Sequence, residues 1–336
     1  MTVAHVAHLP SVDPLAGSAG GGRLREEIAP VHLGRSASPP LNYKTFQRAA
    51  GLLYQLAGIT LNDSKQHLVR TRLGRRLTAT GAETFEAYLE DHVEPCLSRY
   101  LAGQLRQGKD RARSTAATAG ACELTHFIDV LSTNLTSFFR EPVHFRYLSD
   151  VVLPPLLEKR ARQGSYALRM WCAGCSSGEE AYSLAATVLE AVRRHAKDDR
   201  AHSWDLKILA TDISSRVLDR ARLGIYPDDR CDQIPAPIRG RYFAPRRLPN
   251  DVDCLAAGPK LREAIRFRRL NLLEPWPFSG PFDVVFCRNV MIYFDKQTQS
   301  ALVNRLHGVL QPGGYLMTGH SESLTGIVHP YVYRQA

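Results

Sequence analysis

The hydrophobic positions of residues 42–102 recur with the spacing of short amphipathic helices. The apolar residues at this spacing are Phe46, Leu53, Leu56, Leu61, Leu68, Val69, Leu73 and Leu77. Polar turn and capping residues at 60–63 predict a helix that begins near Ser64, and Thr84 predicts the N-cap of another. We therefore expect a small all-helical domain at residues 41–102.

After residue 121 the pattern changes, because short apolar runs begin to alternate with amphipathic stretches. These features predict strands at 168–173, 207–211, 265–267, 282–287 and 314–318, and helices at 179–195 and 299–310. Strands that alternate with helices indicate an α/β fold with a doubly wound, mostly parallel sheet. Residues 231–264 interrupt the alternation with several Pro and Arg, so we expect an inserted subdomain there.

Two further segments have the composition of connecting or terminal chain. Residues 1–40 are rich in Gly, Ala, Ser and Pro, which predicts a flexible tail; the alternative is a short structured arm. Residues 103–120 are rich in basic and small residues and predict a mobile linker. The α/β domain then occupies residues 121–336.

Composition narrows the class of protein. The 336 residues are 44% hydrophobic, and 43 Lys+Arg against 33 Asp+Glu give a formal net charge of +10. This balance excludes an acidic disordered protein and permits a partner with an acidic surface, whether nucleic acid, membrane or protein. No run approaches the roughly 18 apolar residues of a membrane span, and the N-terminus lacks the pattern of a signal peptide. The seven scattered cysteines do not suggest a disulfide framework, so we expect a cytoplasmic protein.

Three features follow predicted strands, at the edge where doubly wound sheets bind ligands. The small-residue turn at 174–178 precedes a helix and lets a ligand approach the backbone. Asp212 follows the second strand, where it either accepts hydrogen bonds from ribose hydroxyls or caps the next helix. Asn271 and Leu272 follow the third strand, in a position to contact an adenine ring. The turn matches neither G-x-G-x-x-G nor a P-loop, which disfavours NAD and ATP and favours S-adenosylmethionine.

Cys172 and Cys175 have C-x-x-C spacing, which occurs in zinc and redox sites. The sequence offers neither a second ligand pair nor a thioredoxin context, and Cys172 lies in an apolar strand. We interpret both as structural thiols and expect no metal site.

A basic run without acidic residues lies in the predicted helix after Ser64. It consists of Lys65, Arg70, Arg72, Arg75 and Arg76. One interpretation is an ordinary solvated helix face, and another is a docking site for an acidic helical surface. Nucleic acid is the rival partner, but no aromatic residues interleave with the charges as in single-strand stacking platforms.

Several strings, taken in order, resemble the chemotaxis receptor glutamate methyltransferases, the CheR family. They are YQLAGITLNDSKQHLVRTRLGRRL (54–77), STNLTSFFREPVHF (132–145), WCAGCSSGEEAYSLA (171–185), ILATDIS (208–214), GIYP (224–227), LNLLEPWPF (270–278), GPFDVVFCRNVMIYFDKQTQ (280–299) and PGGYLMTGHSESL (312–324). The resemblance covers roughly residues 42–336. It implies a Rossmann-like methyltransferase domain, an N-terminal helical domain for substrate docking, and a β-subdomain at 231–264.

The resemblance also implies roles for individual residues. The implied contacts of S-adenosylmethionine are Asn134, Thr136, Arg140, Glu180, Asp212, Asn271, Leu272, Arg288 and Asn289. By the same resemblance Tyr293 lies near the transferred methyl group, and Arg140 either pairs with the cofactor carboxylate or steers the incoming glutamate. The basic run of the predicted helix becomes a dock for the receptor.

The implied reaction is methyl transfer to receptor glutamates, giving methyl esters in chemotaxis adaptation. A glutamate with a pKa of about 4.3 is ionised at pH 7, so no general base is needed. The implied partner is the cytoplasmic helical region of chemoreceptors, with no nucleic acid and with membrane contact only through receptors. We expect a monomer. The alternative is a methyltransferase of the same fold with a non-chemotaxis receptor or another acceptor.

Overall fold

The computed structural model describes residues 4–8, 39–106, 123–195, 204–249 and 251–335. Most of the predicted tail and linker therefore lies outside the described residues. Within the predicted tail, Ala4–His8 form strand β1, which pairs in parallel with two strands of the main sheet. The prediction of a flexible tail is wrong for these residues, because their backbone is part of the sheet.

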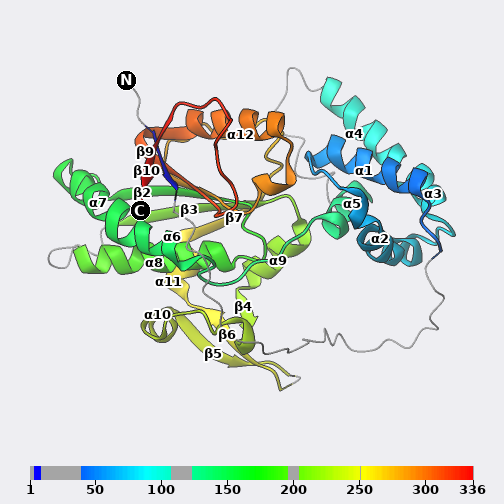
Figure 1. The fold of residues 1–336 in the computed structure, drawn as a ribbon. Helices are drawn as coiled ribbons and strands as arrows, with labels where there is room; N and C mark the ends of the chain where they lie inside the picture. The colour runs from blue at the N-terminus through cyan, green and yellow to red at the C-terminus, as the bar shows by residue number, and fades with distance from the viewer. Residues whose placement is uncertain (1–3, 9–38, 107–122, 196–203, 250, 336) are drawn as a thin grey trace, which may run out of the picture.

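The N-terminal domain is helical, as the spacing predicts (Figure 1). Its helices are α1 (Tyr43–Ala57), α2 (Gln66–Thr80), α3 (Phe85–Tyr88), α4 (Glu94–Arg106) and α5 (Glu123–Leu131), with a 3₁₀ turn at Asp63–Lys65 and a π turn at Leu89–Val93. Thr84 caps α3 as predicted, because its side chain accepts a hydrogen bond from the backbone N of Ala87 at 3.1 Å. The apolar residues of α3 form one core with those of α1 and α2.

The last helix of this core, α5, falls on the other side of the predicted domain boundary at residue 121. Leu124, Phe127, Ile128 and Leu131 of α5 are buried in the same cluster as the apolar residues of α1–α4. By packing, therefore, the helical domain extends to Leu131. The chain pattern alone did not reveal this, because the helical period is the same in either domain.

The main sheet has seven strands in the order β10-β1-β9-β8-β2-β3-β7. Its strands are β1 (Ala4–His8), β2 (Ala167–Ala173), β3 (Asp205–Asp212), β7 (Ile265–Arg269), β8 (Phe282–Cys287), β9 (Leu310–Thr318) and β10 (Tyr331–Gln335). Every pairing between these strands is parallel, and all five predicted strands belong to the sheet.

Helices cover both faces of this sheet (Figure 1). They are α6 (Pro142–Tyr147), α7 (Leu153–Arg162), α8 (Glu179–His195), α9 (Ser215–Leu223), α11 (Pro259–Ala264) and α12 (Lys296–Val309), with a π turn at Leu148–Val152 and a 3₁₀ turn at Met291–Tyr293. Alternate residues of β2 serve the two faces: Met170 and Cys172 pack with α8, and Trp171 packs with α12. Burial on both faces explains why the central strands read as continuous apolar runs.

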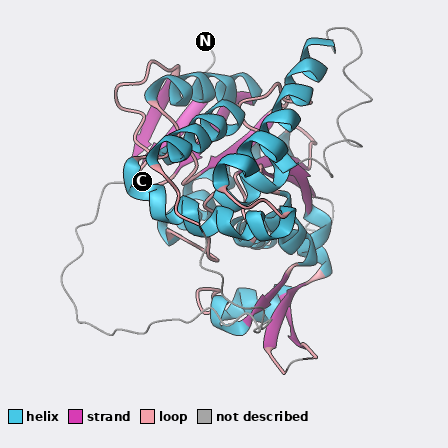
Figure 2. Ribbon diagram, turned by 90° about the vertical axis from the view of Figure 1, so that its right-hand side faces the viewer, coloured by secondary structure: helices cyan, strands magenta, loops and turns pink. Residues whose placement is uncertain are grey.

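The inserted subdomain is a three-stranded antiparallel sheet in the order β4-β6-β5, which stands below the main sheet (Figure 2). Its elements are β4 (Ile225–Pro227), a 3₁₀ turn at Asp228–Arg230, α10 (Ala236–Tyr242), β5 (Phe243–Arg247) and β6 (Asp253–Ala257). It begins at Ile225 rather than at the predicted residue 231, because GIYP supplies its first strand. Among the helices described, none is long and apolar enough to cross a membrane.

Candidate active site

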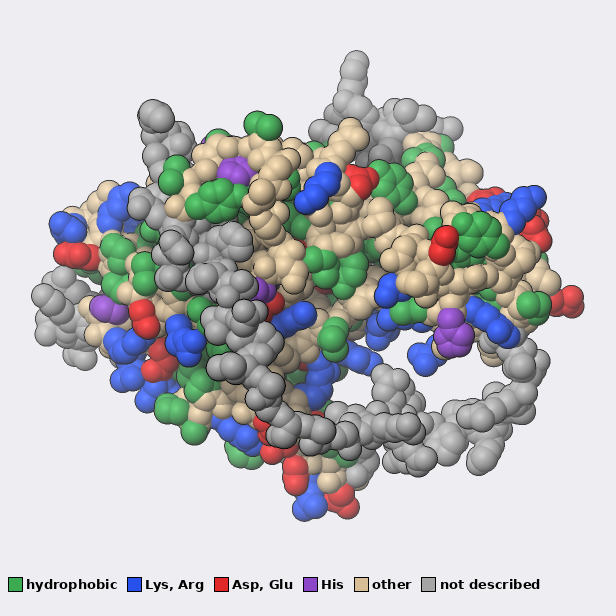
Figure 3. Space-filling model, viewed as in Figure 1, with side chains coloured by type: hydrophobic (Ala, Val, Ile, Leu, Met, Phe, Trp, Pro, Cys, Tyr) green, Lys and Arg blue, Asp and Glu red, His purple; other side chains and the backbone are tan. Residues whose placement is uncertain are grey.

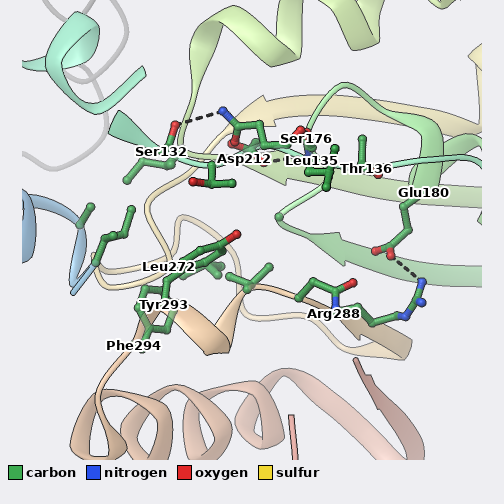
Figure 4. A pocket seen from close by; sticks show the side chains of 18 of the residues that line it. Ser132, Leu135, Thr136, Ser176, Glu180, Asp212, Leu272, Arg288, Tyr293 and Phe294 are labelled. Atoms are coloured by element: carbon green, nitrogen blue, oxygen red, sulfur yellow. Dashed lines mark hydrogen bonds and ion pairs between the residues drawn. The ribbon is translucent and has the colours of Figure 1, made fainter. Parts of the chain in front are cut away.

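A pocket of about 860 Å³, including its open mouth, lies at the carboxyl ends of β2, β3 and β8. This is the edge at which doubly wound sheets bind ligands. Figure 4 shows Thr136, Ser176 and Asp212 on one side and Leu272, Tyr293 and Phe294 on the other. The residues that border it are Ala57, Ile59, Ser132, Thr133, Asn134, Leu135, Thr136, Arg140, Gly174, Ser176, Glu180, Asp212, Ile213, Leu270, Asn271, Leu272, Arg288, Asn289, Val290, Tyr293 and Phe294.

Asp212 ends β3 and is buried beside the pocket. Its Oδ2 accepts a hydrogen bond from the backbone N of Ser176 at 2.8 Å, and its Oδ1 accepts one from that of Ser214 at 2.9 Å. Ser214, not Asp212, is the N-cap of α9, because its side chain accepts from the backbone N of Val217. The backbone N–H of Ile213 is a further donor, but burial outweighs these hydrogen bonds and raises the pKa of Asp212 to about 6. A carboxylate that lines the pocket here can accept hydrogen bonds from ribose hydroxyls.

The small-residue turn after β2 brings the backbone close to the pocket. Gly174 has φ +81°, and a Cβ there would lie 2.3 Å from a methyl carbon of Val290, so the turn needs glycine. Ser176 follows with φ 48°, and its hydroxyl donates to the backbone O of Asn134 at 2.8 Å. The turn therefore connects the segment that carries Asn134 to the end of β3.

A buried ion-pair network closes one end of the pocket. The fully buried guanidinium of Arg288 donates to Glu180 Oε2 at 2.7 Å, to Glu141 Oε2 at 3.0 Å and to the backbone O of Arg140 at 2.6 Å. Figure 4 shows the pair of Glu180 and Arg288. Burial alone would raise the pKa of Glu141, but hydrogen bonds with His144 and Arg288 and the charge of Arg288 lower it overall. Glu180 is held at both oxygens, because its Oε1 accepts a hydrogen bond from the Cys172 thiol at 3.3 Å.

Glu322 holds the segment after β8 in place. Its buried carboxylate accepts hydrogen bonds from four backbone N–H groups, those of Asn289, Val290, Met291 and Gly319, at 2.7–2.8 Å. Burial raises the pKa of Glu322, although the four N–H donors oppose that shift. Asn289 itself has φ 57°, a strained backbone conformation that this anchor maintains. Tyr293 lies two residues after Met291, the last anchored residue.

Cationic side chains surround Tyr293 at the mouth of the pocket. The charges of Arg140 and Arg72 both act on Tyr293, although burial has the larger effect and raises the pKa of its hydroxyl. Arg140 donates to the backbone O of Leu135 at 3.0 Å, which places its guanidinium beside the loop that enters the pocket. An anionic substrate group that reaches Tyr293 would therefore meet two positive charges.

The structure brings every predicted cofactor and catalytic residue to this one pocket. They are Asn134, Thr136, Arg140, Glu180, Asp212, Asn271, Leu272, Arg288, Asn289 and Tyr293. The sequence reasoning assigned no role to Glu141, Glu322, Ala57 or Ile59. The first two lie in the strings FFREP and GHSES, which already carried the family resemblance. Ala57 and Ile59 gave no signal, because they are ordinary apolar residues of another domain.

The predicted docking residues divide into two groups. Lys65 and Arg75 are exposed on the surface. Arg76 is instead bound by Glu123, with two hydrogen bonds of 2.8 Å. Arg72 donates to the backbone O of Leu131, the last residue of α5, at 3.1 Å and to that of Ser132 at 3.0 Å. Arg70 is half-buried and donates to the backbone O of Pro39. The basic run itself contains no acidic residue, but the fold brings Glu123 of α5 to Arg76.

Lys and Arg side chains nevertheless remain on both sides of the hollow between the helical domain and the inserted subdomain (Figure 3). Arg216 of α9 is exposed, and its charge opposes that of Arg72 across the domain boundary. Two positive charges repel one another, and an anion between them relieves that repulsion. The surface beside the pocket mouth therefore favours an acidic partner.

Cys172 and Cys175 are free, buried thiols, and burial raises the pKa of both well above the usual value. No metal-binding group of His, Cys, Asp and Glu occurs among the described residues. Cys172 packs in the core against α8, as a structural thiol does.

The parallel sheet, the acidic residue that ends its second strand and the pocket at the strand ends define a Rossmann-like, S-adenosylmethionine-dependent methyltransferase. Comparison with known protein families identifies the family within this class. Residues 134–334 match the CheR methyltransferase SAM-binding domain, and residues 44–91 match the CheR methyltransferase all-alpha domain. The chain belongs to the CheR family.

Several chemotaxis protein methyltransferases align with this chain over most of their own length. The chain is 39% identical to chemotaxis protein methyltransferase 2 of Pseudomonas aeruginosa, over 84% of this chain and 88% of that one. It is 37% identical to the chemotaxis protein methyltransferase of Borreliella burgdorferi, over 83% and 88%, and 35% identical to that of Escherichia coli, over 86% and 87%. Its cofactor is S-adenosylmethionine.

Proposed function

We propose that this chain methylates glutamate side chains in the cytoplasmic helical region of chemoreceptors, using the pocket beside Tyr293 as its active site. The observation that carries the proposal is one pocket that is lined by the buried Asp212 together with Arg140 and Tyr293, with the charge of Arg140 acting on Tyr293. Membership of the CheR family supports the same substrate class.

The residues of the pocket fit the parts of S-adenosylmethionine. Asp212 would accept hydrogen bonds from the ribose hydroxyls, since its carboxylate ends β3 and lines the pocket. Leu272 and Phe294 offer an apolar slot for adenine. Glu180 would bind the ammonium group of the methionine part, and Arg140 its carboxylate or that of the substrate. The bound cofactor supplies a methyl group on a positively charged sulfur.

The protein has to position the substrate rather than activate it. A glutamate with a pKa of about 4.3 is already ionised at pH 7, so no general base has to remove a proton. Arg140, Arg72 and Tyr293 attract and orient the carboxylate at the mouth of the pocket. In-line positioning of reactants can contribute about 7–11 kcal/mol to catalysis. Exclusion of water helps as well, because the opposite charges of carboxylate and sulfonium neutralise one another during transfer.

Lys65, which directly precedes α2, and Arg75 of α2 are proposed to bind the acidic face of the receptor helices, with the chain acting as a monomer. Substituting Lys65→Glu and Arg75→Glu together is expected to lower kcat/KM for receptor methylation by about tenfold, because two attractive contacts become repulsive. Initial rates with receptor-bearing membranes measure this effect. The loss should diminish at high salt, which screens exposed charges.

The matched control is the double reversal Lys159→Glu and Arg162→Glu on α7, on the opposite side of the molecule from α2. The control should keep the wild-type rate, and both double variants should bind S-adenosylhomocysteine as the wild type does. Equal rates for the two double variants would place the receptor elsewhere. If the wild type and the α7 control bound nucleic acid and the Lys65/Arg75 variant did not, nucleic acid would be favoured as the partner of this surface.

A further inference from the structure

The inserted subdomain, which stands below the main sheet in Figure 2, contacts the walls of the pocket without bordering it. None of its described residues, 225–249 and 251–257, lines the pocket. Two of its side chains nevertheless bond to the turn between β2 and α8, which does border the pocket. They belong to Tyr226 of β4 and to Arg230 of the 3₁₀ turn that follows β4.

The hydroxyl of Tyr226 holds this turn from outside the pocket. It is buried and donates a hydrogen bond to the backbone O of Ser177 at 2.7 Å. The preceding residue, Ser176, makes the contacts on the pocket side, because its backbone N donates to Asp212 and its hydroxyl to the backbone O of Asn134. A shift of the turn at Ser177 therefore displaces groups that line the cofactor site.

The ring of Tyr226 supports a second wall of the pocket. Phe138 is fully buried, and its ring packs edge to face with those of Tyr226 and Phe243, at centroid distances of 4.9 and 5.5 Å. Phe138 lies in the loop between Thr136 and Arg140, both of which line the pocket. Tyr226 therefore contacts two wall segments with different parts of its side chain, the turn with its hydroxyl and the loop with its ring.

Arg230 bonds to the first residue of α8. This residue, Glu179, is fully buried, and its Oε1 accepts a hydrogen bond from Arg230 Nη2 at 2.5 Å. Its Oε2 accepts one from the hydroxyl of Ser177 at 2.7 Å. A carboxylate buried in this way requires a paired charge, which the subdomain supplies. Glu180, the next residue of α8, lines the pocket, so the subdomain fixes the helix end that carries Glu180.

On the basis of the function proposed above, we propose that the inserted subdomain positions the part of the pocket that binds the ribose and methionine portions of the cofactor, with Tyr226 and Arg230 as its positioning residues. Neither side chain lines the pocket, so each acts through the residues that it holds. Tyr226 sets the turn that carries Ser176, and Arg230 sets the helix end that carries Glu180. Losing either contact should therefore weaken cofactor binding and leave receptor binding as it is.

The first test compares Tyr226→Phe with its matched control Tyr182→Phe, by calorimetric titration of the full chain with S-adenosylhomocysteine. Tyr182 is buried in the same core and donates to the backbone O of Ala221 at 2.9 Å, so each substitution removes one buried donor from one carbonyl. Of the two hydroxyls, only that of Tyr226 holds the turn at the pocket. We expect Tyr226→Phe to weaken binding about fivefold, as the loss of one hydrogen bond can, and Tyr182→Phe to stay within about twofold of the wild type.

The second test compares Arg230→Gln with Arg239→Gln in the same titration. Arg239 lies in the same subdomain and pairs with Asp228, and neither of these two residues lines the pocket. Arg230→Gln leaves the buried carboxylate of Glu179 without its charged partner, so we expect binding to weaken about tenfold. Arg230→Lys should restore most of the affinity, and Arg239→Gln should bind as the wild type does.

Initial rates separate positioning of the cofactor site from a loss of folded protein. Tyr226→Phe and Arg230→Gln should raise KM for S-adenosylmethionine by the factor seen in the titration, with kcat and KM for the receptor near the wild-type values. A purely structural role would lower kcat and Tm without raising KM, and that result, or equal S-adenosylhomocysteine affinities within both pairs, overturns the proposal. If the wild type itself does not bind S-adenosylhomocysteine, the function proposed above fails and this proposal fails with it.

Discussion

Asp212→Ala is expected to weaken the binding of S-adenosylhomocysteine by about 100-fold. The substitution removes the acceptors for two ribose hydroxyls, and hydrogen bonds to a charged group contribute about 1.5–3 kcal/mol each. It also releases the backbone N–H groups of Ser176 and Ser214, which shape the turn beside the pocket. Calorimetric titration measures the affinity directly, and thermal unfolding shows whether the variant still folds.

The control for this substitution is Asp219→Ala, which removes an exposed carboxylate of α9 whose ion pair is with Arg222. It should bind S-adenosylhomocysteine as tightly as the wild type. An unchanged affinity of Asp212→Ala would contradict the assignment of the ribose site.

The affinity of the wild type should also depend on pH through Asp212. Its folded-state pKa of about 6 lies above the ordinary value, so the folded protein holds this proton up to higher pH than the unfolded chain does. Ionisation of Asp212 therefore costs folding stability as the pH rises from about 4 to 6, whereas ribose binding requires the ionised form. At pH 5 about one-tenth of the sites are ionised, so affinity should fall roughly tenfold from its value at pH 7. Asp212→Asn should remove this part of the pH dependence.

Arg288→Met is expected to destabilise the fold by about 3–5 kcal/mol. Arg288 is the shared partner of Glu180 and Glu141, and removing one partner of a buried ion pair leaves an uncompensated charge. Methionine fills similar space without replacing the donors. For a domain of this size the loss corresponds to a fall in Tm of about 10 °C or more, measured by thermal unfolding at pH 7.

Lys296→Met is the matched control, because Lys296 is an exposed cation at the start of α12. Its Tm should stay within about 1–2 °C of the wild type, as for most surface substitutions. If Arg288→Met unfolded at the same temperature as Lys296→Met, the two carboxylates would not depend on Arg288.

The pocket could be predicted from the sequence because its residues follow strands. Strand periodicity places Asp212, Asn271 and Arg288 at carboxyl ends, and parallel strands bring those ends to one edge. The resemblance to the CheR family supplied the roles of these residues. Local patterns and short motifs are enough for this part of the site, since each element contributes its residue at a fixed register.

Contacts between distant segments could not be predicted in the same way. In the sequence Arg76 has no acidic residue close to it. In the structure its guanidinium pairs with Glu123, which lies 47 positions away. Ala57 and Ile59 border the pocket only because α1 packs against the segments at Leu273 and Phe294. Side-chain pairing and domain contact depend on tertiary packing, which the period of hydrophobic residues does not encode.

The most direct test of the function is methyl transfer from labelled S-adenosylmethionine to receptor-bearing membranes, followed by mild alkali. Glutamate methyl esters hydrolyse under these conditions, so we expect label on receptor-sized bands that alkali releases as volatile methanol. Asp212→Ala should give almost no label in the same assay. Label that resists alkali would mean an N- or C-linked product and would contradict transfer to receptor glutamates.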